Sequence, residues 1–236
     1  EEALAALEKQ APASVAIEEA IEKHDRVVVL GDPGSGKSTL LKHLTLRLAS
    51  ERSGRLPILV PLNAYAAALE KDDLNLQAYL PQYFANLSAA ITGLQPLFDM
   101  VLAQGQALVL LDGLDEVQRE RGQLVRKVEA FSEDAVRAGN KVVVTSRIVG
   151  YRDCALEAKK WILHTLLDFD EQAINAFASQ WCLAFEKSTR GDTLEAAAAA
   201  EVERQSLLAA IGANPGVSRL AANPLLLTIL ALIKRQ

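Results

Sequence analysis

The sequence predicts an α/β fold, with a parallel sheet of five strands, followed by a helical subdomain. Five runs rich in Val, Leu and Ile alternate with helical patterns over residues 25–168, and residues 107–111 are apolar throughout, as strands covered on both faces are. From Asp170 onward the apolar period is helical. The 236 residues, half of them hydrophobic, are enough for one large domain with an appendage. We therefore expect N-terminal helices at 1–24, an α/β domain at 25–168 and a helical subdomain at 169–236.

The first part of the chain alternates predicted helices and strands. Residues 2–24 have apolar positions at helical spacing, and Pro12 divides them into two short amphipathic helices. A Val-rich run at 26–30 ends at a glycine, which indicates a strand, and leucines over 40–48 indicate the helix after it. A second strand is predicted at 57–62. The domain thus begins with the order strand, glycine loop, helix.

The middle of the chain continues this alternation, with glycines closing helices and Val-rich runs marking strands. In order, the predicted elements are helices at 76–87 and 97–102, a strand at 107–111, a helix at 124–136, and strands at 141–145 and 161–167. Strands that alternate with helices in this way favour a parallel sheet with helices on its faces.

Composition and charge exclude several classes of protein. The 25 Lys and Arg against 30 Asp and Glu give a net charge of −5, which argues against nucleic-acid binding through bulk positive charge. Two cysteines are too few for a disulfide framework, so we expect a cytoplasmic protein with two buried or idle thiols. The apolar stretch 225–233 is shorter than the roughly 20 residues that cross a bilayer, so no membrane partner is expected. Because the chain begins without Met and stops inside an apolar helical run, we expect a piece of a longer polypeptide, with its helical subdomain truncated.

A glycine-rich loop lies between the first predicted strand and its helix. Its sequence from Gly31 to Ser38 fits the pattern G-x-x-x-x-G-K-[ST] in the structural context that the pattern requires. In such a loop, backbone N–H groups and the next helix N-terminus bind phosphate oxygens, the lysine reaches the β- and γ-phosphates, and the serine hydroxyl binds Mg²⁺. The sequence therefore predicts a nucleotide and Mg²⁺ site formed by Gly31, Pro33, Gly34, Ser35, Gly36, Lys37, Ser38 and Thr39.

Three acidic residues follow the strand at 107–111. Ligands of doubly wound sheets lie at the carboxyl ends of the strands, so Asp112 is predicted to hold Mg²⁺ through water. Asp115 and Glu116 are two candidates for the group that orients or deprotonates the attacking water, and the residues alone leave both open. The alternative is that Asp115 and Glu116 only complement the dipole of the helix that follows.

Two further motifs come after the acidic segment. Thr145-Ser146-Arg147 ends the next apolar strand, and its arginine is expected level with Asp112, within reach of a γ-phosphate whose oxygens the guanidinium matches. Farther on, Asn223-Pro224 begins a helix, with Asn as the N-cap and Pro at the first position. On the residues alone, Pro224 indicates no more than this helix start.

Taken together, the motifs resemble a NACHT module of the STAND class of P-loop NTPases. The resemblance covers about residues 20–236 and rests on the phosphate loop and, in this order, on LLDGLDE at 110–116, TSR at 145–147 and NPLLLTIL at 223–230. Its most specific part is the small residue directly after the first Asp, with acidic residues slightly later.

The resemblance implies a sheet of order 5-1-4-3-2, Arg147 as a sensor at the γ-phosphate and Pro224 packed against adenine. It also implies a regulatory ATPase with slow Mg²⁺-dependent hydrolysis, held closed by ADP and allowed to oligomerise by ATP. Family members are switches in larger signalling proteins, including innate immune receptors and prokaryotic counterparts in anti-phage defence. The implied partners are therefore an adenine nucleotide, effector and sensor domains of a longer chain, and further copies of the activated protein.

Four other classes of nucleotide-binding protein are alternatives to a NACHT module. A transporter ATPase of the ABC type would need an LSGGQ-like segment before the acidic strand, and none is present. A GTPase would need Asn-Lys-x-Asp, but Asn140-Lys141 is followed by two valines. A P-loop small-molecule kinase needs an Arg-rich lid, for which residues 119–126 are the candidate. The last alternative is a module that binds nucleotide without turnover, against which Asp115 and Glu116 count.

Overall fold

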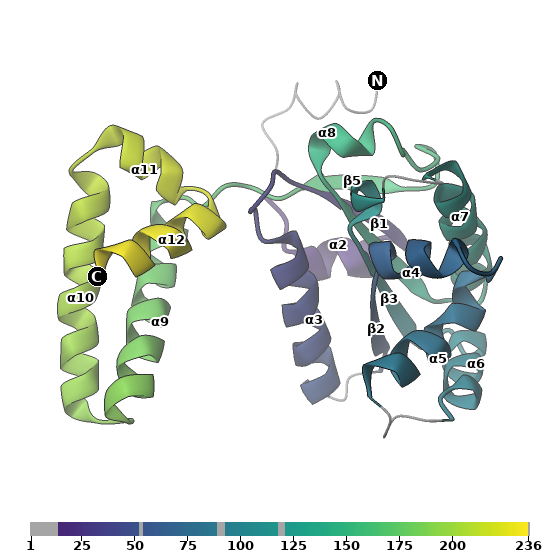
Figure 1. The fold of residues 1–236 in the computed structure, drawn as a ribbon, viewed down its shortest axis with the longest axis horizontal. Coiled ribbons are helices and arrows are strands. Elements are labelled where there is room, and N and C mark those ends of the chain that lie inside the picture. Colours follow the sequence, from purple (N-terminus) through teal and green to yellow (C-terminus); the bar gives the residue numbers. More distant parts are fainter. Residues whose placement is uncertain (1–13, 52–53, 89–92, 118–120, 236) are drawn as a thin grey trace. The chain divides into compact units, whose positions relative to one another are not determined.

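The computed structural model describes residues 14–51, 54–88, 93–117 and 121–235 (Figure 1). Backbone contacts divide the chain into two units. The α/β unit runs to Asp32 and resumes over Lys37–Leu166, whereas the helical unit joins Leu167–Gln236 with the loop residues Pro33–Gly36. The first predicted N-terminal helix and Pro12 lie outside the described residues.

The sheet of the α/β unit has five strands, all paired in parallel. They are β1 (Arg26–Leu30), β2 (Leu56–Pro61), β3 (Ala107–Asp112), β4 (Lys141–Ser146) and β5 (Ile162–Thr165), in the order β2-β3-β4-β1-β5. This confirms both the parallel sheet and the expected order. Only β5 is markedly shorter than predicted, because its register with β1 begins at Ile162 and β1 itself ends at Leu30, whose carbonyl accepts the N–H of Leu166 at 2.8 Å.

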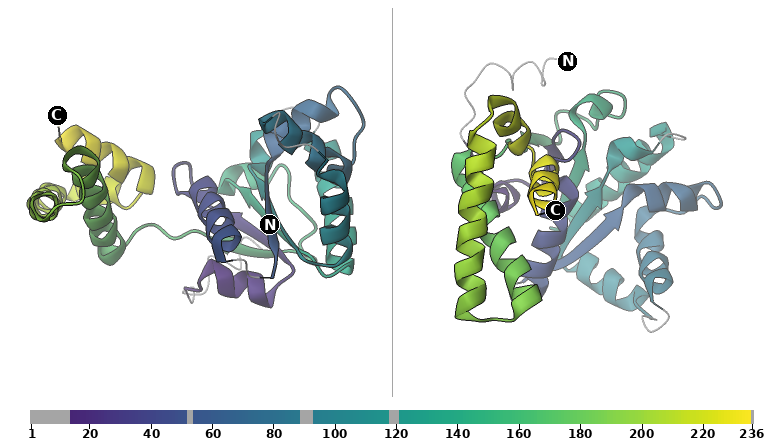
Figure 2. Two further views of the ribbon diagram at one scale, coloured as in Figure 1. Left: turned by 90° about the horizontal axis from the view of Figure 1, so that it is seen from below. Right: turned by 60° about the vertical axis from the view of Figure 1, so that its left-hand side comes forward.

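Alternate residues of the central strands face two separate apolar layers, which is why β1, β3 and β4 are almost wholly apolar. Val28 and Leu30 belong to a core shared with the helices between residues 62 and 151, whereas Val27 and Val29 pack with the helices Ile17–Lys23 and Lys37–Glu51. Helices therefore cover both faces of the sheet (Figure 2). The register sets Leu30 opposite Ser146, so that β1 and β4 end at the same edge of the sheet.

Five helices of the α/β unit agree with the predicted positions, with extensions at several ends, whereas Leu62–Leu69, Leu114–Glu116 and Ile148–Tyr151 were not predicted to be helical. In chain order, the helical elements are α2 (Ile17–Lys23), α3 (Lys37–Glu51), α4 (Leu62–Leu69), α5 (Leu76–Leu87), α6 (Gln95–Ala103), the 3₁₀ turn η1 (Leu114–Glu116), α7 (Arg121–Arg137) and α8 (Ile148–Tyr151). The most consequential difference is at α3, which begins three residues before the predicted 40–48, directly at Lys37. The lysine of the loop motif is therefore part of the helix N-terminus.

In the part of the chain that the structure describes, strand β2 forms one edge of the sheet and pairs only with β3. The N–H of Leu56 donates to the carbonyl of Gln106 at 2.7 Å, on the side of β3. Proline occupies the second and the last positions of the strand, Pro57 and Pro61.

The helical unit consists of α9 (Glu171–Arg190), α10 (Leu194–Gly212), α11 (Pro215–Ala221) and α12 (Pro224–Lys234). Each helix begins with a capping side chain that accepts hydrogen bonds from the first turn: Asp170, Thr193, Asn214 and Asn223. Among the described residues, no helix is both long and apolar enough to span a membrane.

Within the helical unit, the start of α12 is hydrogen-bonded to the loop segment Pro33–Gly36. The side-chain amide of Asn223 donates to the carbonyl of Pro33 at 3.1 Å, and the N–H of Leu225 donates to the carbonyl of Gly34 at 3.2 Å. The backbone of this segment is thus held at two carbonyls.

Candidate functional site

The phosphate loop joins the carboxyl end of β1 to the N-terminus of α3. Gly34 and Gly36 have φ angles of 78° and 92°, in the left-handed region where glycine is favoured. Helix α3 has 15 residues and no acidic residue in its first turn, so its own first turn leaves the positive end of the helix dipole unopposed. This is the arrangement that binds anions at a helix N-terminus.

Lys37 lies at the start of α3 and folds back over the beginning of the loop. Its ammonium donates to the carbonyls of Gly31 at 2.7 Å and Asp32 at 3.0 Å. Burial lowers the pKa of Lys37, Asp115 opposes this shift and Arg147 adds to it, with Asp112 opposing it more weakly. The lysine is therefore within electrostatic range of the charged residues that follow β3 and β4. Next to it, Ser38 and Thr39 are exposed in the first turn of α3.

Asp112 is the last residue of β3 and is held by the end of β4. The hydroxyl of Thr145 donates to Asp112 Oδ1 at 2.5 Å, and the same hydroxyl oxygen accepts the N–H of Gly113 at 2.9 Å. Since the N–H already occupies one lone pair of Thr145 Oγ1, the hydroxyl proton is directed to the carboxylate. Gly113 has a φ of 80°, and a Cβ there would lie 3.0 Å from the Glu116 side chain. A glycine is therefore needed to turn this N–H toward Thr145.

The donor set at this edge fits Mg²⁺. Asp112 Oδ2 is not used in the Thr145 bond, and Ser38 offers a hydroxyl, so both available donors are hard oxygen atoms, which Mg²⁺ prefers. No group of three or more His, Cys, Asp or Glu able to hold a metal occurs in the described ranges. A magnesium ion here would therefore take its remaining ligands from phosphate oxygens and water, as is usual for this ion.

Asp115, Glu116 and Arg147 are brought together beyond the ends of β3 and β4. Asp115 Oδ2 lies 3.3 Å from Arg147 Nε, and Glu116 Oε1 lies 3.9 Å from Arg147 Nη2. The Asp115 side chain is 7% exposed, whereas that of Glu116 is 45% exposed. The two candidates for the base thus differ strongly in access to solvent.

Pro224 is the first residue of α12, and Asn223 caps that helix, as the sequence predicted for this helix start. A contact of Pro224 with adenine stays a prediction. The sequence indicated a role for Arg147, but not for Thr145 or Ser146, nor the hydrogen bond from the Asn223 amide to Pro33. Thr145 and Ser146 are fully buried polar residues at a strand end, and such residues directly after an apolar run are the signal that could have identified them.

The segments that would have supported a kinase or a GTPase have structural explanations. Of the candidate lid at 119–126, residues 119 and 120 lie outside the described ranges, and the part from Arg121 on is helix α7, where Arg121 Nε donates to the carbonyl of Val117 at 2.5 Å. Asn140 is fully buried and bonds to the backbone of Ala107 at 2.9 Å. In the described part of the lid segment, Arg121 is thus bonded within the chain, and the Asn140 side chain is bonded to the backbone rather than presented to a guanine base.

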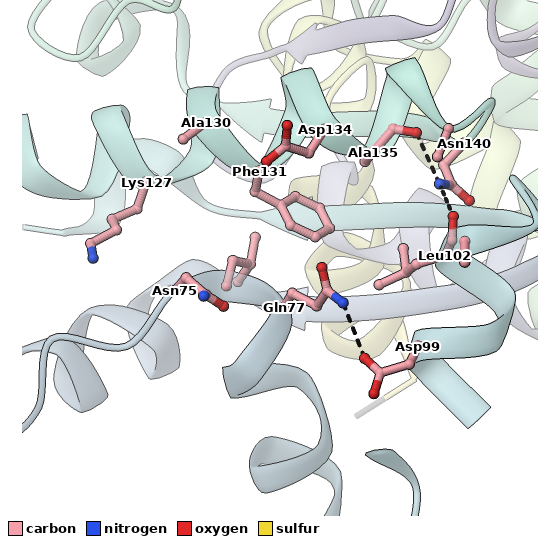
Figure 3. A pocket seen from close by; sticks show the side chains of 13 residues that line it. Asn75, Gln77, Asp99, Leu102, Lys127, Ala130, Phe131, Asp134, Ala135 and Asn140 are labelled. Carbon is pink, nitrogen blue, oxygen red and sulfur yellow. Dashed lines mark hydrogen bonds between the residues drawn. The ribbon is translucent and has the colours of Figure 1, made fainter. Parts of the chain in front are cut away.

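A cavity of about 330 Å³ lies elsewhere in the α/β unit, among α5, α6 and α7 (Figure 3). Its polar residues bond to one another or to near neighbours: Gln77 Nε2 donates to Asp99 Oδ1 at 3.0 Å, and Lys127 lies 2.7 Å from Asp73. Phe131 and Leu102 provide the apolar wall. The cavity contains none of the predicted site residues.

No curated protein sequence matches this chain. Among solved structures, the chain is similar to AMPPCP-bound DnaA from Aquifex aeolicus, with 15% identity and a TM-score of 0.47, over 76% of this chain and 52% of that one. It is similar to domain III of the Thermotoga maritima replication initiation protein DnaA, with 13% identity and a TM-score of 0.49, over 88% and 80%. It is also similar to a STAND protein with a tetratricopeptide repeat sensor from Pyrococcus horikoshii, with 15% identity and a TM-score of 0.38, over 80% and 27%.

The chain therefore spans about half the length of the A. aeolicus DnaA chain and a smaller part of the P. horikoshii protein. A family model gives a more direct result. The model of the NACHT domain matches residues 25–184, which is more than half of the chain and includes the phosphate loop, the acidic segment after β3 and Arg147. The chain belongs to the NACHT family, and is thus a P-loop NTPase module.

Proposed function

We propose that this module binds ATP and ADP with Mg²⁺ and hydrolyses ATP slowly. The observation that carries the proposal is the common sheet edge where β1, β3 and β4 end: Leu30 lies opposite Ser146, and Thr145 donates to Asp112, so the phosphate loop follows a strand whose neighbours end in charged groups. A cation from the loop, a carboxylate for Mg²⁺ and an arginine for the γ-phosphate are the parts that phosphoryl transfer requires.

Each part has a proposed role. The backbone of Gly34, Ser35 and Gly36 and the N-terminus of α3 bind the phosphates, with Gly31, Pro33 and Thr39 completing the loop and the first helical turn. Lys37 neutralises the β- and γ-phosphates, and Ser38 and Asp112 hold Mg²⁺. Arg147 reaches the γ-phosphate, and Pro224 packs against adenine. Bound magnesium would draw negative charge from the phosphate oxygens.

Hydrolysis also needs a group that accepts a proton from the attacking water. As water oxygen bonds to the γ-phosphorus and ADP leaves, the proton passes to a carboxylate. Glu116 is 45% exposed and touches Arg147 only at 3.9 Å, so its oxygens are accessible to water. We assign the role of proton acceptor to Glu116 in preference to Asp115. Hydrolysis is slow because Arg147 and Glu116 reach their active positions only in an assembled, active state.

In the cell, the proposed module is a cytoplasmic switch within a larger signalling protein of the immune type, such as those of anti-phage defence. ADP holds it closed, and ATP permits opening and self-association. Its partners are effector and sensor domains of the longer chain. Binding to membranes or to nucleic acids is not part of the proposal. Membership of the NACHT family supports this proposal.

The first experiment identifies by chromatography the nucleotide released when the purified protein is denatured. Co-purified ADP is expected. Single-turnover hydrolysis, with protein in excess over ATP and Mg²⁺ present, then measures chemistry separately from product release. We expect slow formation of ADP that Glu116→Gln reduces by at least about a hundredfold while ATP affinity is kept. Failure to bind either nucleotide would contradict the proposal.

A second candidate is a module that binds nucleotide without hydrolysing it. The enclosure of Asp115, which removes one of the two possible bases from contact with water, favours it. Tight binding of ATP with no ADP formed over many hours would support this candidate.

A further inference from the structure

Asp115 is enclosed by two consecutive residues from the end of β4. Its Oδ1 accepts the main-chain N–H of Arg147 at 2.9 Å and lies 3.2 Å from the hydroxyl of Ser146. Its Oδ2 lies 3.3 Å from Nε of the Arg147 side chain. Both oxygens of Asp115 are thus engaged, and Arg147 contacts it through both its backbone and its side chain.

The opposite side of Asp115 is closed by α8, the short helix that Arg147 precedes. A Cβ added to Gly150 would lie 2.5 Å from the Cβ of Asp115, so the backbone of α8 packs directly against this residue. The carboxylate is therefore confined between the end of β4 and the helix that continues from it. Water has little access to a side chain that is 7% exposed.

This environment is unsuitable for a general base and suitable for fixing an arginine. A base needs a lone pair that a water molecule can approach within hydrogen-bonding distance. Asp115 instead uses its oxygens for a charge-assisted contact with a guanidinium. The Arg147 side chain is long and 50% exposed, and a contact at Nε restricts it near its middle. The terminal nitrogens, which match phosphate oxygens, are not needed for this contact.

We propose that Asp115 is a positioning residue, which orients Arg147 toward the γ-phosphate and thereby sets how well the protein distinguishes ATP from ADP. The inference rests on the proposed function, because only a bound nucleotide gives Arg147 a phosphate to contact. Asp115 contributes to the site through Arg147, and Glu116 is left as the residue that meets water.

The test is a double-mutant cycle on Asp115 and Arg147, with affinities for ADP and for the non-hydrolysable analogue AMPPCP measured by calorimetry with Mg²⁺. Asp115→Asn keeps an oxygen for the N–H of Arg147 but removes the charge that holds the guanidinium. We expect Asp115→Asn and Arg147→Ala each to lower the preference for AMPPCP over ADP by about three- to tenfold. The double variant should be no worse than Arg147→Ala alone.

Glu116→Gln is the matched control, because Glu116 is the other carboxylate beside Arg147. It should leave the AMPPCP to ADP preference within about twofold of wild type while reducing single-turnover hydrolysis. Thermal unfolding checks that all variants fold.

Three results would overturn the inference. One is an unchanged preference in Asp115→Asn, and another is a double variant that loses the product of the two single effects. The third is loss of hydrolysis in Asp115→Asn with the preference intact, which would identify Asp115 as the base. If wild type binds neither nucleotide, the proposed function itself is wrong, and that result is distinguishable because it precedes any comparison of variants.

Discussion

Two polar regions of the α/β unit differ in the origin of their hydrogen-bond partners. At the carboxyl ends of β3 and β4, Thr145 bonds to Asp112 and Arg147 bonds to Asp115, so each pair joins neighbouring strands. Around the cavity among α5, α6 and α7, Gln77 bonds to Asp99 and Lys127 to Asp73, mostly near the protein surface. The cavity encloses about 330 Å³, whereas the strand ends have charges that the fold brings together at a cost in desolvation.

The comparison teaches that volume alone does not identify the site. A site for a polyphosphate needs positive groups beside the phosphate loop, and the N-terminus of α3 with Lys37, which donates to the carbonyls of Gly31 and Asp32, supplies them. Lys127 in the cavity has its own carboxylate partner, Asp73, at 2.7 Å. Three predictions follow from this difference.

The largest effect is expected when the lysine of each region is removed. Lys37→Ala should lower the affinity for ATP by roughly a thousandfold, because truncating one member of a partly buried ionic contact costs about 2–5 kcal/mol. Lys127→Ala, the matched control, should leave the affinity within about twofold of wild type. Calorimetric titration with ATP and Mg²⁺ measures both. Similar losses of ATP affinity in Lys37→Ala and Lys127→Ala would show that the strand ends and the cavity do not differ in nucleotide binding.

A smaller effect is expected at Asn140, on stability rather than binding. Its amide donates to the carbonyls of Leu102 and Ala135, and its oxygen accepts the N–H of Ala107. Asn140→Ala should lower the free energy of unfolding in urea by about 2–3 kcal/mol, because it leaves buried backbone groups without partners. ATP affinity should stay unchanged.

Gln77→Ala, which removes an exposed hydrogen bond at the same cavity, should cost about 0.5 kcal/mol or less. If Asn140→Ala instead weakened ATP binding in a fully folded protein, the cavity would be coupled to the nucleotide site, and the two regions would not be functionally separate.

The smallest effect is expected at Thr145. Thr145→Val keeps the shape of the side chain but removes the hydroxyl that joins Gly113 to Asp112. Because Asp112 then loses its orientation, ATP affinity with Mg²⁺ should fall by about tenfold, while affinity measured in EDTA should not change. Thr145→Ser should restore the wild-type value. Equal losses with and without Mg²⁺ would indicate a general structural defect instead.

Much of the fold and part of the site could be predicted from the sequence. The strand, glycine loop and helix order around Lys37 follows from a motif with a known mechanism, and β3 follows from its unbroken apolar run. The contacts of Thr145 and Asp115 could not be predicted, because they depend on the register between β3 and β4 and on the left-handed backbone of Gly113. Asn140 marks the limit most clearly, since a residue typical of a turn proves to be fully buried.

The prolines of β2 affect how copies of this protein can associate. Alternate residues of a strand direct their N–H groups to opposite sides, and Leu56 directs its own toward β3, so positions 57, 59 and 61 face the open edge. Proline occupies two of these three positions, and Leu59 alone keeps a donor there. A strand of another chain can therefore form few backbone hydrogen bonds with this edge, which disfavours amyloid-like stacking. Assembly of copies by backbone pairing is therefore disfavoured at this edge of the sheet.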